Sequence, residues 1–120
     1  MQDKDNLGAL PLHKAARNGN TDAIQLLLDN KANVQGKDNY GATPLHLAAL
    51  NGYTNAIDLL LKYNADIEAK NDGHYTPLQL TAQYNSKRAF LFLLRNGADI
   101  TNLDETTRKY IEVLCKGAPL

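Results

Sequence analysis

The sequence contains a single cysteine, Cys115, among its 120 residues, so it cannot form an internal disulfide. A reducing compartment suits such a chain, and we expect an intracellular, cytoplasmic protein. No apolar run approaches the roughly 20 residues that a membrane-spanning helix needs. Residues 1–5 also lack the apolar core of a signal peptide. These absences predict no membrane span and no membrane partner.

Net charge is absent as well. The chain has 13 Lys and Arg residues against 13 Asp and Glu residues, which gives a formal net charge of zero. A balanced charge argues against a nucleic-acid partner, although it leaves room for a local basic patch. The hydrophobic content of 43% and the charged content of 22% are typical of a soluble globular protein, and the length suits one domain.

The common catalytic motifs are missing too. The sequence has no G-x-S-x-G, P-loop or H-E-x-x-H spacing. Asp66 and Asp99 resemble a pair of catalytic acids, but they recur at equivalent places in a repeated pattern and so belong to a turn. We therefore predict that the protein is not an enzyme and has no catalytic residues, no cofactor and no metal.

What the chain does have is a stretch that recurs at a fixed spacing. Residues 10–16 read L-P-L-H-K-A-A, residues 43–49 read T-P-L-H-L-A-A, and residues 76–82 read T-P-L-Q-L-T-A. Each copy lies 33 residues from the next, and a period of this length indicates stacked structural repeats. The units align without a gap. Three full units cover about residues 5–37, 38–70 and 71–103, and a partial fourth covers residues 104–120.

The start of each unit predicts a turn and a short helix. Thr43 and Thr76 are suited to cap a helix, and the proline after each lies in the first turn, where a missing N–H costs nothing. Asn51 and Gly52 mark the end of this first helix.

The rest of the unit predicts a second helix. Thr54 is expected to cap it, as are Thr21 and Ser86 in the other units. Leucines and isoleucines then recur at i, i+3 and i+4, which predicts an apolar face. Beyond this helix, residues 66–70 are expected to be extended and residues 71–73 to form a turn. The predicted core residues of this unit are Leu45, Ile57, Leu60 and Leu61.

The pattern D-x-x-G-x-T-P-L-H-x-A-A at residues 38–49 resembles the ankyrin repeat. Leu-Leu-Leu at residues 59–61 and Ala-Asp-Ile at residues 65–67 match the second half of that repeat, and the resemblance extends over nearly the whole chain. It implies an all-α fold, an ankyrin-repeat solenoid of stacked helix-turn-helix units joined by hairpin-like turns. We expect one such domain over residues 1–120, with the partial last unit as a C-terminal cap.

Three departures from the repeat carry structural predictions. Leu10 stands where a capping Thr is expected, so the first helix of unit one loses its cap. His74 stands in the place of a glycine, which predicts a distorted hairpin tip in unit three. Gly97 suits a left-handed helix end, Asn64 suits it tolerably, and Lys31 suits it poorly.

The C-terminal unit predicts a single closing helix instead of a pair. Asp104 is suited to cap a helix that starts at Glu105 and ends at Gly117. Apolar residues recur along it at helical spacing, and polar residues are expected on its solvent face, as a terminal cap requires. The apolar residues are Leu103, Tyr110, Ile111 and Leu114, and the polar ones are Arg108, Lys109, Glu112 and Lys116.

The N-terminal end has no equivalent cap. The chain begins at a repeat edge, which is typical of a segment of a longer array. We expect Ala16, Ile24 and Leu27 to lie beside an uncovered outer face. Such a face predicts a monomer with weak self-association through its N-terminal repeat.

Two residue types invite a sharper chemical interpretation. His13 and His46 could ligate a metal, but stacked helices lie roughly 8–10 Å apart, too far for adjacent units to share one ion. We favour a hydrogen bond between turn and helix, a role that the amide of Gln79 can also fill. Cys115 occupies the position of Ala49 in its unit, which predicts a small packing residue and not a nucleophile.

The resemblance also implies where a protein partner binds. Ankyrin repeats generally bind partners through their hairpin tips and the concave side of their first helices. Among the matching positions, those with apolar or aromatic side chains are the strongest candidates for binding, because exposing such side chains to water brings no stabilisation. The candidate residues are Asn6, Leu7, Ala9, Arg17, Asn18, Asn39, Tyr40, Ala42, Leu50, Asn51, Asp72, His74, Tyr75, Gln83 and Tyr84.

These observations predict a non-catalytic protein–protein interaction module. Two alternatives use the same surface and stay open at this point. One is an inhibitory or regulatory subunit of an enzyme, and the other is a structural segment of a longer ankyrin array, such as a host-directed effector or a scaffold.

Overall fold

The computed structural model describes residues 8–116, which form seven helices and no strand. The helices alternate between short and longer ones, as the 33-residue period predicts. The predicted all-α fold is confirmed. The helices are α1 (Pro11–Arg17), α2 (Thr21–Asp29), α3 (Pro44–Leu50), α4 (Thr54–Lys62), α5 (Pro77–Gln83), α6 (Lys87–Arg95) and α7 (Glu105–Lys116).

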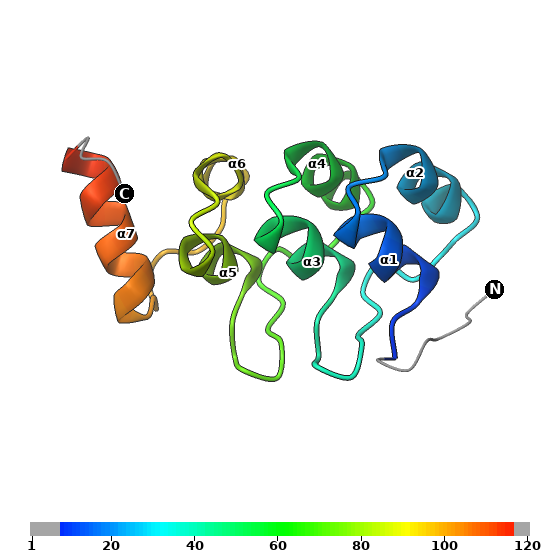
Figure 1. Ribbon diagram of the computed structural model, residues 1–120, viewed down its shortest axis with the longest axis horizontal. Coiled ribbons are helices and arrows are strands. Elements are labelled where there is room, and N and C mark those ends of the chain that lie inside the picture. Colours follow the sequence, from blue (N-terminus) through cyan, green and yellow to red (C-terminus); the bar gives the residue numbers. More distant parts are fainter. Residues whose placement is uncertain (1–7, 117–120) are drawn as a thin grey trace.

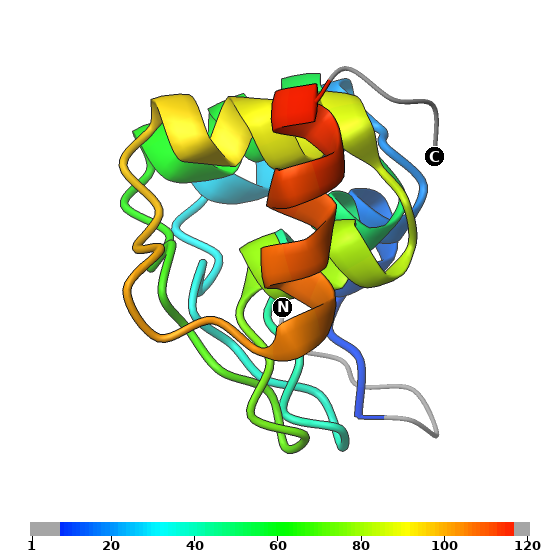
Figure 2. The same cartoon turned by 90° about the vertical axis from the view of Figure 1, so that its left-hand side faces the viewer.

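The helices stand in two parallel rows (Figure 1). The first helices α1, α3 and α5 form one row, and the second helices α2, α4 and α6 form the other. The turns between the pairs hang below the first row as hairpin-like tips, which Figure 2 shows from the end of the array. The α7 helix packs against α5 and closes the first row.

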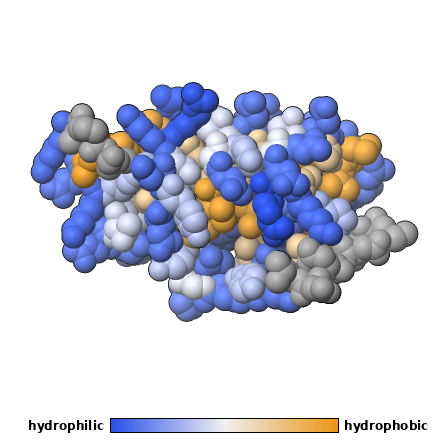
Figure 3. Space-filling view, viewed as in Figure 1, coloured by the Kyte–Doolittle hydropathy of each residue, from blue (hydrophilic) through white to orange (hydrophobic). Residues whose placement is uncertain are grey.

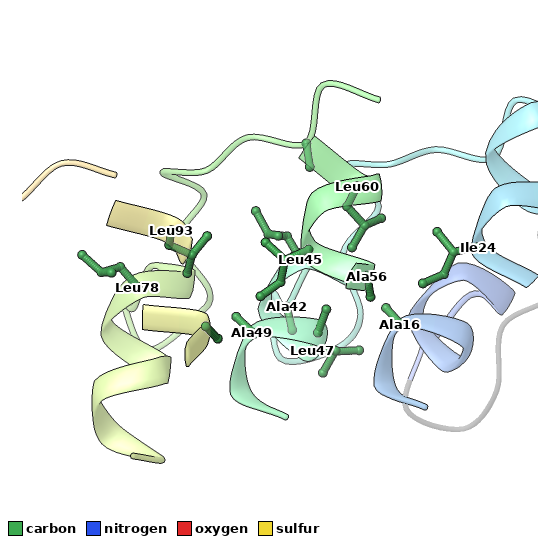
Figure 4. Packing of buried hydrophobic residues seen from close by; sticks show 14 of the residues in the cluster. Ala16, Ile24, Ala42, Leu45, Leu47, Ala49, Ala56, Leu60, Leu78 and Leu93 are labelled. Carbon is green, nitrogen blue, oxygen red and sulfur yellow. The ribbon is translucent and has the colours of Figure 1, made fainter. Parts of the chain in front are cut away.

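The core runs along the array between the two rows (Figure 4). Leu45, Ile57 and Leu60 are fully buried, as predicted, whereas Leu61 is only partly buried. Ala16 and Ala56 are also fully buried, and side chains this small let neighbouring helices approach closely. Burying a leucine or isoleucine stabilises the fold by about 1.5–3 kcal/mol, so this core holds the pairs together.

The first helices begin as the sequence predicts. The Thr43 Oγ1 accepts the His46 N–H at 3.3 Å, and the Thr76 Oγ1 accepts the Gln79 N–H at 3.3 Å. Leu10 holds the same extended conformation but has no capping side chain. The predicted loss of the cap in the first pair is confirmed.

The second helices begin differently from the prediction. Thr21 and Thr54 are the first residues of α2 and α4, so they cannot cap them. Asn20 caps α2 by accepting the Ala23 N–H at 3.1 Å. Ser86 does hold the cap position of α6, but its hydroxyl donates to the Leu50 carbonyl at 3.3 Å instead. The caps of α2 and α4 were predicted one residue too late, because Asn20 and Tyr53 hold the cap positions there.

The second helices end in a left-handed residue, as predicted. The φ angle is 67° at Lys31, 70° at Asn64 and 89° at Gly97. The segment after α4, predicted as extended, instead contains a turn. In this turn the Ala69 N–H donates to the Asp66 carbonyl at 3.2 Å, and the Asp66 Oδ1 accepts the Glu68 N–H at 2.9 Å. The short aspartate side chain favours this turn over an extended strand.

The predicted distortion of the third tip is wrong. His74 has a φ of 68°, close to the 73° of Gly41, and its N–H donates to the Asn71 carbonyl at 2.9 Å. At Gly41 a Cβ would lie 2.8 Å from the backbone nitrogen of Asp72 in the next tip. Within residues 8–116 no tip follows the third one, so a side chain fits at His74 and only the left-handed backbone is strained.

The closing helix α7 forms as predicted. Asp104 caps it by accepting the Thr107 N–H at 3.1 Å, and the buried Tyr110 ring packs edge-on against Phe90 with 4.8 Å between the ring centroids. Gly117 lies outside the described residues. The polar side chains predicted on the outer face, Arg108, Lys109, Glu112 and Lys116, are all exposed.

Cys115 does not take the packing position predicted for it, because it is exposed on α7. The 33-residue alignment no longer identifies equivalent positions in a unit that folds as one long helix.

The N-terminal end of the array also differs from the prediction. Ala16 and Ile24 are fully buried, and Leu26 is the exposed residue, at 64% of its surface. Leu59, at the same place in the next pair, is only half exposed because α2 precedes it.

Candidate interaction surface

Two buried histidines fix the tips to the helices. The Nδ1 of His46 accepts the Thr43 N–H at 3.1 Å, and its Nε2 lies 2.9 Å from the Tyr75 carbonyl in the next unit. His13 bonds in the same way to Leu10 and to the Ala42 carbonyl, at 3.0 and 2.9 Å. Since Nδ1 accepts a hydrogen bond from a backbone N–H, Nε2 must carry the ring hydrogen and donate it to the carbonyl. The predicted bond between turn and helix is confirmed, and it also joins adjacent units.

The environment of His46 favours the neutral ring. Burial lowers its pKa below the ordinary value of 6.5, and the bond to the Tyr75 carbonyl only partly offsets this effect. Both ring nitrogens are occupied by backbone groups of the protein. Residues 8–116 contain no group of three or more His, Cys, Asp or Glu side chains arranged to hold a metal ion.

The tips have a rigid backbone. The Asp38 Oδ1 accepts the N–H groups of Tyr40 and Ala42 at 2.9 and 3.0 Å. The Tyr40 carbonyl in turn accepts the Asp72 N–H of the next tip at 2.9 Å. Asn71 repeats the role of Asp38 in the third tip. The sequence showed Asp or Asn at these positions in every unit, but only the structure shows that they hold the tips in shape.

The candidate residues fall into four groups. Those at the tips and at the ends of the first helices are mostly exposed, with Tyr40 at 62% and Tyr84 at 60%. The exposed residues are Asn18, Asn39, Tyr40, Asn51, Asp72, His74, Gln83 and Tyr84, and the half-buried ones are Arg17, Leu50 and Tyr75. Ala9 and Ala42 are buried. Asn6 and Leu7 lie outside the described residues.

The burial of Ala9 and Ala42 has a physical reason. Each lies at the base of a tip, where the chain passes under the helix row, and the Ala42 carbonyl is the acceptor for His13. Their side chains therefore support the tips and present almost no surface to solvent. The prediction for these two positions followed the family pattern, which identifies a place in the repeat and not the direction of a side chain.

The ends of the first helices form the floor behind the tips. The Asn51 Nδ2 donates to the Leu47 carbonyl at 3.0 Å and to the Arg17 carbonyl of the previous unit at 3.3 Å. Leu50 is half-buried beside it. Figure 3 shows apolar surface on this face, between α3 and α5, surrounded by hydrophilic groups. An apolar floor with polar edges has the arrangement of a protein–protein interface, which has an apolar centre and a polar rim.

A polar hollow lies beside the third tip. It has a volume of about 210 Å³, and its lining includes Glu68, His74, Gln79 and Asp99. The Gln79 Oε1 accepts the Thr76 N–H at 2.9 Å, so its amide takes the place that His46 takes in the previous unit, as predicted. The hollow lies where the next tip would stand if the array continued.

The sequence model of one family, described as Ankyrin repeats (3 copies), matches residues 1–71. The match covers the first two helix pairs and ends before α5. The third pair is recognised as a repeat of the same kind because its first helix has the same Thr-Pro start and its turns have the same left-handed residues. No curated protein matches the chain. Among the described residues, no helix combines the length and the apolar character that crossing a membrane requires.

Proposed function

Because the chain belongs to the ankyrin-repeat family, we propose that it binds a protein partner through its hairpin tips and the concave face of its first helices, without catalysing a reaction. Ankyrin repeats are generally protein-interaction modules. The single observation that carries the proposal for this chain is the pair Tyr40 and Tyr84, exposed at 62% and 60% on a scaffold held by hydrogen bonds.

Tyr40 combines a fixed backbone with a free side chain. Its N–H donates to Asp38 and its carbonyl accepts from Asp72, yet its ring extends into solvent. A tyrosine loses little side-chain entropy on binding, and a preset backbone lowers the ordering cost further. Such anchors often cost about 2 kcal/mol or more when they are truncated in an interface.

The test first identifies the partner by photocrosslinking. A photoreactive phenylalanine analogue replaces Tyr40 in one protein and Leu26 in a control, because Leu26 is equally exposed but lies at the outer N-terminal end. We expect a protein that crosslinks from position 40 and not from position 26. Equal crosslinking from both positions would contradict the proposal.

The affinity of that partner is then measured for Tyr40→Ala, Tyr84→Ala and Leu26→Ala. We expect the tyrosine variants to bind at least about tenfold more weakly and to keep the thermal midpoint of the parent protein. Leu26→Ala should bind normally. Normal binding by both tyrosine variants, or unfolding of Tyr40→Ala, would show that the binding face lies elsewhere.

A further inference from the structure

The row of second helices ends at α6, and no further second helix follows it within residues 8–116. In this row α2 packs against α4, and α4 packs against α6. The closing helix α7 packs mainly against α5 in the other row, and it reaches α6 where Tyr110 contacts Phe90 (Figure 1). Since α7 is a single helix, residues 8–116 supply no second helix to cover the far side of α6.

The first pair identifies which side of α6 is uncovered. In α2, Gln25 and Asp29 both bond to the Tyr63 hydroxyl of the next pair, at 2.6 Å each. The equivalent residues of α6 are Leu91 and Arg95, two repeats later. An open hollow of about 380 Å³ lies along this side of α6, and we name it the α6 groove. It is lined by Lys87, Arg88, Leu91 and Arg95.

The charge of the α6 groove is one-sided. Lys87, Arg88 and Arg95 form no ion pair with any carboxylate of residues 8–116. Two of them lie in the first turn of α6, where the helix dipole makes a cation unfavourable. The fold therefore keeps two charges at positions that weaken the helix carrying them. Figure 3 shows hydrophilic groups beside apolar surface at the edge of α6 that faces α7.

We propose that the α6 groove binds an acidic amphipathic helix of a partner protein. That helix takes the position of the missing second helix, with carboxylates toward the three cations and an apolar side chain against Leu91. Helices commonly bind in this way, with apolar residues placed in a groove and charges on its edges. The surface lies on the second-helix row, so it is separate from the tips and the concave floor.

The mixed character of the groove favours a protein helix over other anionic partners. A nucleic acid or a lipid surface is attracted by cations alone, and its affinity rises with their number. The chain as a whole has no net charge, and the groove has only three cations around an apolar residue. An occupant that satisfies both parts needs carboxylates and an apolar face together.

The probe is a capped 18-residue helical peptide with glutamates along two edges of a leucine stripe. A second peptide has the same composition in an order that destroys the stripe. Binding is followed by amide chemical shifts of the full chain at 50 mM and 300 mM salt. We expect saturable shifts in residues 87–95 with the first peptide, binding at least about tenfold weaker with the second, and weaker binding at high salt.

Two variants of equal charge change separate the groove from general electrostatics. One replaces Lys87, Arg88 and Arg95 with Gln, and the other replaces Lys14, Lys31 and Lys37 with Gln. We expect the first to bind the peptide at least about tenfold more weakly and the second to bind within about twofold of the parent chain. Leu91→Ala, which keeps every charge, should also weaken binding.

Three results would overturn the proposal. The two peptides bind equally well, or the two triple variants lose equal affinity, or a single-stranded oligonucleotide or a phosphatidylserine vesicle binds residues 87–95 more tightly than the striped peptide. The last result would assign the groove to a different class of partner. Circular dichroism of each variant confirms that it is folded before binding is measured.

Discussion

The α3–α5 contact and the α5–α7 contact join α5 to its two neighbours by different means. Toward α3, the His46 side chain reaches the Tyr75 carbonyl and the Asp72 N–H reaches the Tyr40 carbonyl, so helices and tips are both bonded. Toward α7 there is no tip. There Tyr110 of α7 packs edge-on against Phe90 of α6, and its hydroxyl donates to the Oδ1 of Asn85, just after α5, at 3.1 Å.

This difference separates two kinds of stability. The inner contacts depend on backbone groups that recur at the same place in each unit, so each unit fixes the position of the next. The outer contact depends on individual side chains that only the last helix supplies. Changes inside the repeats should therefore affect stability more than similar changes in α7, and the predictions below test that expectation from the largest effect to the smallest.

The largest effect is expected in the core between the two rows. Leu60 is fully buried in α4, and its truncation to Ala should destabilise the protein by about 2–5 kcal/mol. Leu114 in α7 is only half-buried, so Leu114→Ala should cost clearly less. Urea unfolding followed by circular dichroism measures both. Equal losses would show that α7 contributes as much to the cooperative core as the inner pairs do.

The tips provide the second test. Gly41 and Gly97 both have a left-handed backbone, but a Cβ at Gly41 would meet Asp72 of the next tip, whereas a Cβ at Gly97 would meet nothing within 4 Å. Gly97→Ala should cost only the left-handed strain less the reduced entropy of the unfolded chain, a net loss of about 0.5–1 kcal/mol. Gly41→Ala should cost a further 1–3 kcal/mol or so for overpacking. Equal unfolding free energies for the two variants would mean that the tips separate easily.

The repeated part of the molecule was predictable because its determinants recur. Thr43 and Pro44 define a helix start through local chemistry, and the 33-residue period defines what each helix packs against. Lys31 was correctly predicted to be left-handed because its equivalents are Asn and Gly. Position in the repeat was therefore enough wherever the next unit has the same form.

The failures arose where that condition did not hold. Cys115 was predicted to be buried because it aligns with Ala49. The last unit folds as the single helix α7, so this alignment no longer holds, and Cys115 lies on the exposed face of α7. Ser86 was expected to cap a helix, and a long-range bond to the Leu50 carbonyl takes its hydroxyl instead. At the candidate site the exposed Tyr40 and Tyr84 were predictable, but the burial of Ala42 and the open side of α6 were not, because both depend on what packs nearby.

The histidine contact provides the third test. His46→Ala leaves the Thr43 N–H without its acceptor, whereas the Tyr75 carbonyl loses one donor and keeps the Asn71 N–H at 3.0 Å. Leaving one buried donor unsatisfied costs about 1–3 kcal/mol. His46→Gln should cost less, because Gln79 already fills this position in the third unit. Urea unfolding of the two variants measures the difference. If His46→Ala is as stable as the parent protein, the contact between adjacent units does not depend on this side chain.

The same residue predicts a pH dependence. Burial lowers the pKa of His46 in the folded protein below the unfolded value of 6.5, so the unfolded chain binds the proton more readily. Its contribution to stability is therefore complete above about pH 6.5 and is lost as the pH falls through the lower, folded pKa. Urea midpoints at pH 7.5 and pH 5 should fall further apart in the parent protein than in His46→Gln. The exposed His74→Gln serves as the control.

The smallest expected effect concerns the left-handed helix ends, where two equivalent positions hold different residues. Lys31 has a φ of 67° and is exposed, so its side chain contributes little packing that could offset the backbone strain. Lys31→Gly removes that strain but increases the entropy of the unfolded chain. Because a left-handed residue with a Cβ costs about 1–2 kcal/mol, we expect a net stabilisation of about 0.5–1 kcal/mol.

Gly97→Lys, the reverse exchange two units later, should destabilise the protein by a similar amount, since nothing lies within 4 Å of a Cβ there. Urea unfolding of both variants measures the pair. A loss in Lys31→Gly together with a loss in Gly97→Lys would show that unfolded-state entropy outweighs strain at the first of these helix ends.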